Sequence, residues 1–168
     1  MSLSMYQASA PVFTQGLKGL LKALAKADAY VAQRKIDPAA LLQARLYPDM
    51  FPFQRQVQIA TDFARGGVAR LAGVEPPSYD DVETSFAELT ARVEAALAFL
   101  ATFEASQFEG AEDRDITLTR RGETSVVKGQ PYLLLQAMPN FYFHLTTAYA
   151  ILRHNGVELG KKDYLATS

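Results

Sequence analysis

Two histidines are the residues of this chain best suited to chemistry, because an imidazole can transfer protons or bind a metal near neutral pH. His144 follows Asn140 by one turn of an expected helix, so both side chains lie on one flank of it. Gln56 lies on the flank of the apolar stripe of an earlier expected helix, whereas Gln58 points more nearly outward. These positions predict a small polar pocket that holds Gln56, Asn140 and His144. In the alternative interpretation, His144 only satisfies a hydrogen bond to a carbonyl, tyrosine or aspartate.

The rest of the composition excludes several classes of site. His154 precedes Asn155-Gly156 at the end of an expected helix, where it would interact with the helix dipole. The chain has no cysteine, so it lacks a thiolate nucleophile, and its 2 histidines cannot form a three-histidine metal site. It contains no glycine-rich phosphate loop, no GxSxG and no Glu-x-x-His pair. We therefore expect no metal and no cofactor.

Length and charge set the broad class of the protein. The 168 residues suffice for one domain, residues 1–168, with a real hydrophobic core. The formal net charge of -1 argues against a nucleic-acid partner, which usually requires a basic excess. The N-terminus lacks a signal-peptide pattern, and the most apolar stretch, residues 131–152, carries too many polar residues for a membrane span. We expect a cytoplasmic protein without a membrane contact.

Four long segments show apolar residues at helical spacing. The first runs from Tyr6 to Val31 and contains Pro11, which predicts a kink or a helix start near Ala10. A short helix is expected over residues 38–46. The second long helix begins near Phe53 and ends at Gly73, a residue type that favours a helix stop.

The third and fourth long helices flank a segment of different periodicity. The third has an expected cap at Ser78 or Asp80 and a stripe that begins at Val82. Residues 116–127 alternate with a period of two and predict a β-hairpin. The fourth is expected over residues 130–155, with Leu134 at the start of its stripe.

Four amphipathic helices must pack together to bury their stripes. The predicted fold class is therefore mainly α, a four-helix bundle with a small β-hairpin between the third and fourth long helices. Phe141, Tyr142 and Phe143 occupy three successive faces of the last helix, so at least one ring points away from the core. The hairpin or a second subunit would cover such a ring, and we expect a homodimer.

Three segments stand out beside the helical pattern: Ala-Pro-Val-Phe in the first helix, residues 46–60 from Leu-Tyr-Pro-Asp-Met-Phe-Pro to Gln-Ile-Ala, and Pro-Asn-Phe-Tyr-Phe-His (residues 139–144) with the following residues 148–161. They resemble a bacterial family defined as a domain of unknown function, which is similar to the DinB-like four-helix bundles. The resemblance to the uncharacterised family extends over nearly the whole chain. It implies a DinB-like bundle, whose relatives include metal-dependent enzymes that transfer or isomerise with low-molecular-weight thiols.

The DinB-like pattern has one histidine on the second helix and HxxxH on the fourth, before a Leu-Arg…Gly ending. Leu152-Arg153…Gly156 matches that ending, which places His144 at the second histidine of HxxxH and Asn140 at the first. The position on the second helix falls near Gln56 or Gln58. Amides thus stand at two of the three ligand positions, so the resemblance implies the fold more than the metal chemistry.

Three functions remain open at this point. The first is an uncharacterised cytoplasmic bundle, without an assignable activity, that has lost the metal of its relatives. The second is an enzyme or small-molecule binder that uses His144 as acid or base and Gln56 and Asn140 as orienting groups, with thiol-linked transfer or isomerisation as the implied chemistry. The third is an interaction module whose surplus aromatic residues and hairpin form a partner surface.

Overall fold

The first long helix begins at a reciprocal N-terminal cap. A computed structural model describes residues 3–120 and 122–167 of the chain. Helix α1 (Met5–Arg34) begins after Ser4, whose hydroxyl accepts the Gln7 N–H while the Gln7 side chain accepts the Ser4 N–H. This capping box starts the helix at Met5, before Pro11, rather than at Ala10.

Of the next two helices, the first is shorter than expected and the second is followed by the expected glycine stop. Helix α2 spans only Pro38–Leu42, so the expected helix over residues 38–46 ends four residues early. Helix α3 spans Phe53–Leu71. Gly73 follows it with a φ of 74°, the left-handed conformation that makes glycine a helix stop.

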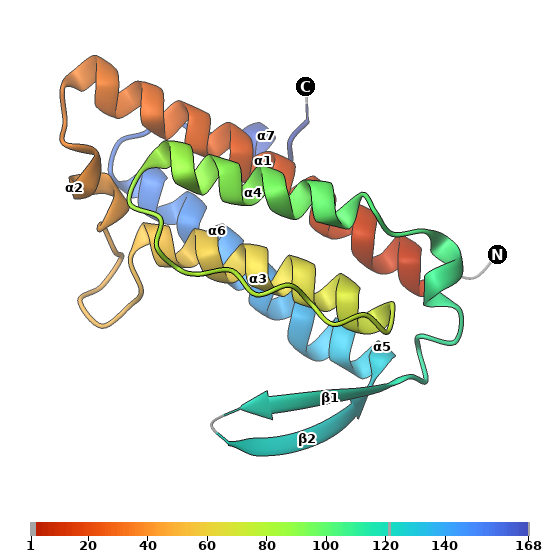
Figure 1. Ribbon diagram of the computed structural model, residues 1–168. Helices are drawn as coiled ribbons and strands as arrows, with labels where there is room; N and C mark the ends of the chain where they lie inside the picture. The colour runs from red at the N-terminus through yellow and green to blue at the C-terminus, as the bar shows by residue number, and fades with distance from the viewer. Residues whose placement is uncertain (1–2, 121, 168) are drawn as a thin grey trace.

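Helix α4 (Phe86–Leu100) begins later than the sequence suggested. Its cap is Ser85, not Ser78 or Asp80, because the Ser85 hydroxyl accepts the Glu88 N–H while the Glu88 carboxylate accepts the Thr84 N–H. Val82 therefore precedes the helix and is exposed. Residues 74–85 instead form an extended segment, here called the strap, that runs back along α3 to the start of α4 (Figure 1).

The predicted hairpin is present between α4 and the last long helix. A short 3₁₀ turn, η1 (Ala105–Phe108), leads to strands β1 (Asp115–Arg120) and β2 (Glu123–Lys128), which pair antiparallel with Ile116 opposite Val127. Ile116 and Leu118 are buried, whereas Val126 is exposed. One face of the hairpin thus packs on the bundle, which a two-stranded sheet needs for stability.

The last long helix contains an irregular turn. It consists of α5 (Gly129–Tyr132), a π-helical turn η2 (Leu133–Ala137) and α6 (Met138–His154). A π turn holds an extra residue and rotates the helix before it relative to the helix after it. Leu133 and Ala137 are consequently buried, whereas Leu134, the expected first core residue of this helix, is 49% exposed.

The four long helices form two layers, α1 with α4 and α3 with α6 (Figure 1). Gly16 lets α1 and α6 approach closely, because a Cβ there would lie 2.6 Å from the Phe141 ring. A short C-terminal helix, α7 (Lys161–Tyr164), packs on α1 at Gly19. The mainly α, four-helix-bundle fold class with its late hairpin is confirmed. Within the described residues, no helix is both long and apolar enough to cross a bilayer.

Candidate functional site

The structure joins two of the three predicted site residues by a direct hydrogen bond between α3 and α6. His144 Nδ1 lies 2.7 Å from Gln56 Oε1, and Gln56 Nε2 donates to the Phe51 carbonyl at 3.0 Å. Because the Gln56 nitrogen faces a carbonyl, its oxygen must face the ring, so Nδ1 is the donor. His144 is thereby held in the tautomer with hydrogen on Nδ1 and a lone pair on Nε2.

Aromatic rings enclose the imidazole. Phe63 of α3 stacks on His144 with ring centroids 6.1 Å apart and planes 12° apart. Phe143 meets the His144 ring edge-on, with a centroid distance of 5.2 Å. Burial, with a smaller contribution from the positive charge of Arg55, lowers the pKa of His144 to about 4. The ring is therefore neutral at pH 7.

The remaining nitrogen of His144, Nε2, has no hydrogen-bond partner among the described residues. The residue is 9% exposed. Among the residues that the structure describes, Arg65 Nε is the buried side-chain nitrogen or oxygen atom that has no hydrogen-bond partner. Nε2 of His144 is thus not a buried orphan, and its lone pair can accept a hydrogen bond from a solvent molecule or a ligand.

Asn140, the third predicted residue, has a different partner. Its Nδ2 donates to the Gln136 carbonyl at 2.7 Å, one turn back along its own helix. The side chain is half-buried and begins the turn that leads to His144. The structure therefore ties Asn140 to the π turn of its helix rather than to the His144–Gln56 pair.

Gln58 lies on another side of α3, and it is buried rather than outward-pointing as the sequence suggested. Its Nε2 donates to Glu83 Oε2 at 2.9 Å, and its Oε1 accepts from Arg55 at 3.2 Å. The strap covers this face of α3, which the apolar pattern of the helix could not reveal. Of the two glutamines at the expected second-helix position, Gln56 alone is bonded to His144.

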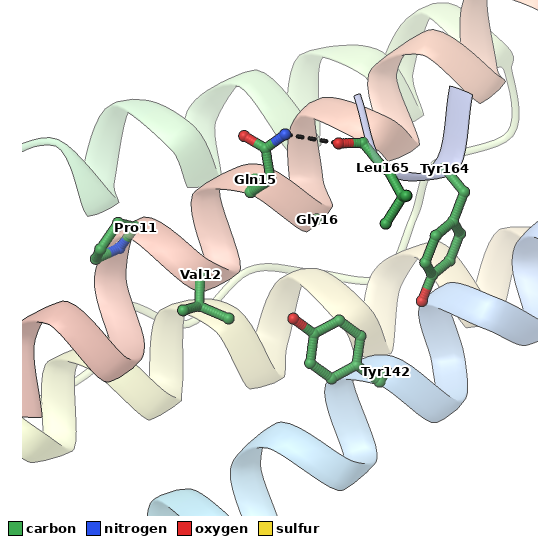
Figure 2. Close-up of a pocket in the computed structure, with 7 residues that line it drawn as sticks. All are labelled: Pro11, Val12, Gln15, Gly16, Tyr142, Tyr164 and Leu165. Atoms are coloured by element: carbon green, nitrogen blue, oxygen red, sulfur yellow. Dashed lines mark hydrogen bonds between the residues drawn. The ribbon is translucent and has the colours of Figure 1, made fainter. Parts of the chain in front are cut away.

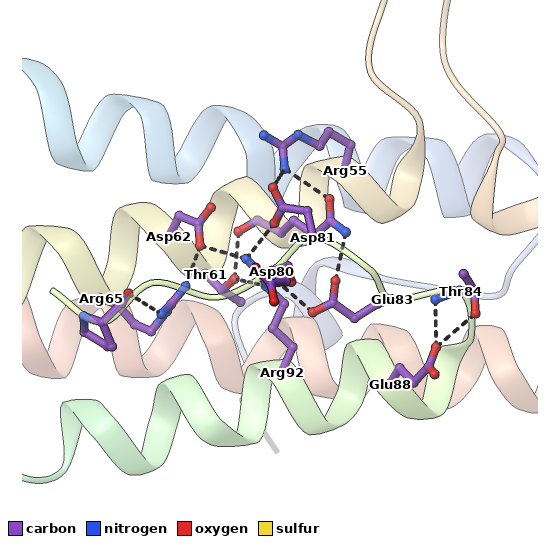
Figure 3. A network of polar contacts seen from close by, with 12 residues as sticks. Arg55, Thr61, Asp62, Arg65, Asp80, Asp81, Glu83, Thr84, Glu88 and Arg92 are labelled. Atoms are coloured by element: carbon purple, nitrogen blue, oxygen red, sulfur yellow. Dashed lines mark hydrogen bonds and ion pairs between the residues drawn. The ribbon is translucent and has the colours of Figure 1, made fainter. Parts of the chain in front are cut away.

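A cluster of charged side chains, which the sequence pattern did not predict, lies beneath the strap (Figure 3). Arg92 of α4 is its centre, with its guanidinium 2.8 Å from Asp62, 2.8 Å from Glu83 and 3.1 Å from Asp81. Its Nε also donates to the Thr61 hydroxyl at 2.9 Å. Arg92 thus links α3, α4 and the strap.

Arg65 extends this cluster along α3. Its guanidinium binds Asp62, donates to the Pro77 carbonyl at 3.0 Å, and lies 3.6 Å from the centre of the Tyr79 ring. Arg65 and Arg92 are both buried. One signal was available in the sequence: Arg92 follows Leu89 by three residues and precedes Ala96 by four, the spacing of a buried helical face.

The ionisation of the cluster is set by burial against pairing. Burial opposes the ionised form of Glu83, but hydrogen bonds from Arg92 and Gln58 hold the pKa of its carboxyl below the ordinary value. Burial likewise opposes the charge of Arg92, but Glu83, Asp62 and Asp81 raise its pKa. For Arg65, burial dominates over Asp62 and Tyr79 and lowers the pKa. These ionic contacts hold the strap in place.

The His144 position does not fit a transition metal. Its potential ligands are one imidazole and two amides, which are weak, oxygen-donating ligands for such ions. The Gln56 oxygen already accepts from His144, and Asn140 points its nitrogen at its own helix. Within the described ranges, no group of three or more histidine, aspartate or glutamate side chains is placed to hold an ion.

Comparisons with known proteins agree with this architecture. No curated protein matches the chain. A solved crystal structure, described as a DinB family member from Shewanella denitrificans, is 43% identical with a TM-score of 0.91, and the match covers 98% of this chain and 93% of the other. The resemblance to DinB-like proteins predicted from the sequence is thereby confirmed. The family model described as a domain of unknown function, DUF1993, matches residues 5–165, and the chain belongs to that family.

Proposed function

We propose that this protein is a non-catalytic DinB-like bundle that works without the metal centre of its relatives. The observation that carries this proposal is the hydrogen bond between His144 Nδ1 and Gln56 Oε1, 2.7 Å long. It engages the glutamine oxygen, so that Nε2 of His144 is the one imidazole lone pair left at the three predicted positions, and a single imidazole does not make a transition-metal site.

The protonation state of His144 also argues against catalysis. An efficient general acid or base has a pKa near the working pH. A pKa of about 4 makes His144 a weak base at neutral pH, and the bound Gln56 holds one tautomer. The open Nε2 is instead a fixed hydrogen-bond acceptor beside two phenylalanine rings.

Metal analysis tests the proposal. Protein purified without a histidine tag should hold well below one equivalent of any divalent transition metal. The matched positive control is the double variant Gln56→His/Asn140→His, which with His144 supplies three imidazoles and should bind zinc or nickel. A stoichiometric metal in the wild type that disappears in His144→Ala would overturn the proposal.

A second candidate function is an enzyme or small-molecule binder that uses a metal-free pocket around His144. The stacked Phe63, the edge-on Phe143 and the open Nε2 favour it, because together they offer an aromatic surface with a polar contact. Thermal-shift screening of the wild type, His144→Ala and Asn140→Ala tests it. Ligand shifts that persist unchanged in both variants would remove this pocket from consideration.

We further propose a homodimer in the cytoplasm, with neither nucleic acid nor membrane as a partner. Apolar side chains exposed on the π turn, α6 and the hairpin support a protein contact there: Val126, Leu134, Leu135 and Phe143. Sedimentation equilibrium should give twice the mass of the chain. The variant Leu135→Lys should shift the mass toward a monomer, and a wild-type monomer at high concentration would contradict the proposal.

A further inference from the structure

A pocket lies on the side of α6 that faces away from His144, between α1, α6 and the C-terminal residues (Figure 2). Tyr142 lines it, and residues two apart on a helix point about 200° apart. The pocket has a volume of about 320 Å³, the small end of the roughly 300–1,000 Å³ that ligand sites occupy. It is lined by Pro11, Val12, Gln15, Gly16, Tyr142, Tyr164 and Leu165.

Two glycines of α1 let the neighbouring elements approach closely around this pocket. A Cβ on Gly16 would strike the Phe141 ring, and a Cβ on Gly19 would lie 2.1 Å from the Tyr164 carbonyl. The glycines therefore let α6 and α7 approach α1 from two directions. Gln15 closes one side by donating to the Leu165 carbonyl at 2.6 Å, and Lys26 fixes α7 by an ion pair with Asp163 at 2.8 Å.

The described walls of the pocket are apolar or polar, and none of the described residues that line the pocket is charged. Tyr164 has its hydroxyl 2.9 Å from the Thr146 hydroxyl, so a protein contact already occupies it. Tyr142 forms a ring contact with Phe141, but no hydrogen bond of its hydroxyl to another described residue is present. In Figure 2 the Tyr142 hydroxyl points into the space beside Val12.

Tyr142 remains a hydrogen-bond donor over a wide pH range. Burial, together with the neighbouring Tyr164, raises the pKa of its hydroxyl above the ordinary value. A neutral phenol can donate to an acceptor atom of a ligand, whereas an ionic ligand would find no countercharge among the described lining residues.

We propose that this pocket binds a small, neutral aromatic molecule with one hydrogen-bond acceptor, which takes its hydrogen bond from the Tyr142 hydroxyl. The ring system lies against Val12, Gly16 and Leu165. This site is separate from the His144–Gln56 pair, and its ligand would fasten α7 to α1.

Titration with quinoline, followed by two-dimensional NMR, tests the proposal. Quinoline carries a neutral ring and one acceptor nitrogen, whereas quinoline-2-carboxylate adds a negative charge. Quinoline should shift the amide resonances of residues on α1, α6 and α7 that line the pocket, with saturation. The carboxylate should bind at least tenfold more weakly.

Variants assign the contacts. Tyr142→Phe should weaken quinoline binding about fivefold, as the loss of one hydrogen bond would. Val12→Phe should fill the pocket and abolish binding, and Leu165→Ala, at an exposed wall position, should weaken it if Val12→Phe does not fold. Tyr47→Phe, at an exposed tyrosine outside the pocket, is the matched control and should change nothing.

Three outcomes would overturn the proposal. They are shifts confined to other surfaces, equal binding of quinoline and its carboxylate, and unchanged affinity in Tyr142→Phe together with Val12→Phe or Leu165→Ala. The metal-free proposal for His144 depends on none of these results, because the Tyr142 pocket contains neither His144 nor Gln56.

Discussion

Helix α3 carries two buried polar sites on different faces, and the bundle stabilises them in opposite ways. Toward α6, the His144–Gln56 pair is neutral and is completed by one backbone carbonyl. Toward α4, Arg65 and Arg92 remain charged and are neutralised by carboxylates of α3 and the strap. A buried polar group needs hydrogen bonds, but a buried cation also needs a countercharge.

The comparison also separates two possible roles. The neutral pair leaves one nitrogen open for a ligand, whereas each strong contact of Arg92 is made within the protein. The charged cluster therefore reads as structural, a set of contacts that holds the strap across α3 and α4. Each site retains one nitrogen without a hydrogen-bond partner among the described residues, but Arg65 Nε is buried, whereas Nε2 of His144 is not.

The largest effect is expected from the charged cluster. Arg92→Met should lower the free energy of unfolding by about 3 kcal/mol, because it leaves the Glu83 carboxylate without a cation and Asp62 with Arg65 alone. Urea unfolding measures this change. Arg153→Met, at an exposed position of α6, is the control and should change stability by less than about 0.5 kcal/mol. Equal losses of stability in both variants would contradict a stabilising role for the ion pairs of Arg92.

The next effect is the pH dependence that His144 imposes. Its folded pKa of about 4 lies below the ordinary 6.5, so the unfolded chain binds the proton more readily. This contribution is complete above pH 6.5 and is lost as the pH falls toward 4, in total roughly 2–3 kcal/mol. The free energy of unfolding should therefore depend less steeply on pH between 7 and 4 in His144→Gln than in the wild type. The same slope in both proteins would contradict the neutral, buried ring.

The charged cluster loses its contribution to the free energy of unfolding at a lower pH than His144 does, so the two contributions can be measured separately. The folded pKa of Glu83 is lowered, so its contribution is present above the ordinary carboxyl range and is lost as the pH falls through that lower value. His144→Gln should leave the loss of stability at the lower pH intact. Glu83→Gln should reduce that loss and leave the loss between pH 6.5 and 4 unchanged.

A smaller effect is expected from Gln56. Gln56→Leu removes the partner of His144 Nδ1 and of the Phe51 carbonyl, and should cost about 1–3 kcal/mol in the free energy of unfolding. It also frees the tautomer of His144, which nitrogen NMR chemical shifts of the ring would report. Gln54→Leu, at a residue whose side chain pairs with the exposed Gln43, is the control.

The smallest effect is expected from Asn140. Its amide bonds to a carbonyl of its own helix, so Asn140→Ala should cost less than about 1 kcal/mol and leave the pKa of His144 unchanged. NMR titration of the His144 ring measures this. A shifted pKa would place Asn140 within the electrostatic environment of the ring and would widen the candidate site to all three predicted residues.

The sequence predicted most of the fold, because apolar spacing at three and four residues identifies a helix and its buried face. The predictions that failed share a cause. Leu134 and Val82 were assigned to core faces by continuing a regular helix through the π turn and the strap. Gln58 was expected to point outward because helical periodicity describes one element and ignores what covers it.

For the candidate site, the sequence identified the chemical types and the structure decided the partners. Two histidines, no cysteine and amides at the matching positions follow from the chain alone. Which amide meets His144 depended on the rotation of α3 against α6, and which charges are buried depended on the path of the strap. Those facts come from contacts between residues far apart in the chain, which no local pattern encodes, and tertiary packing alone decides them.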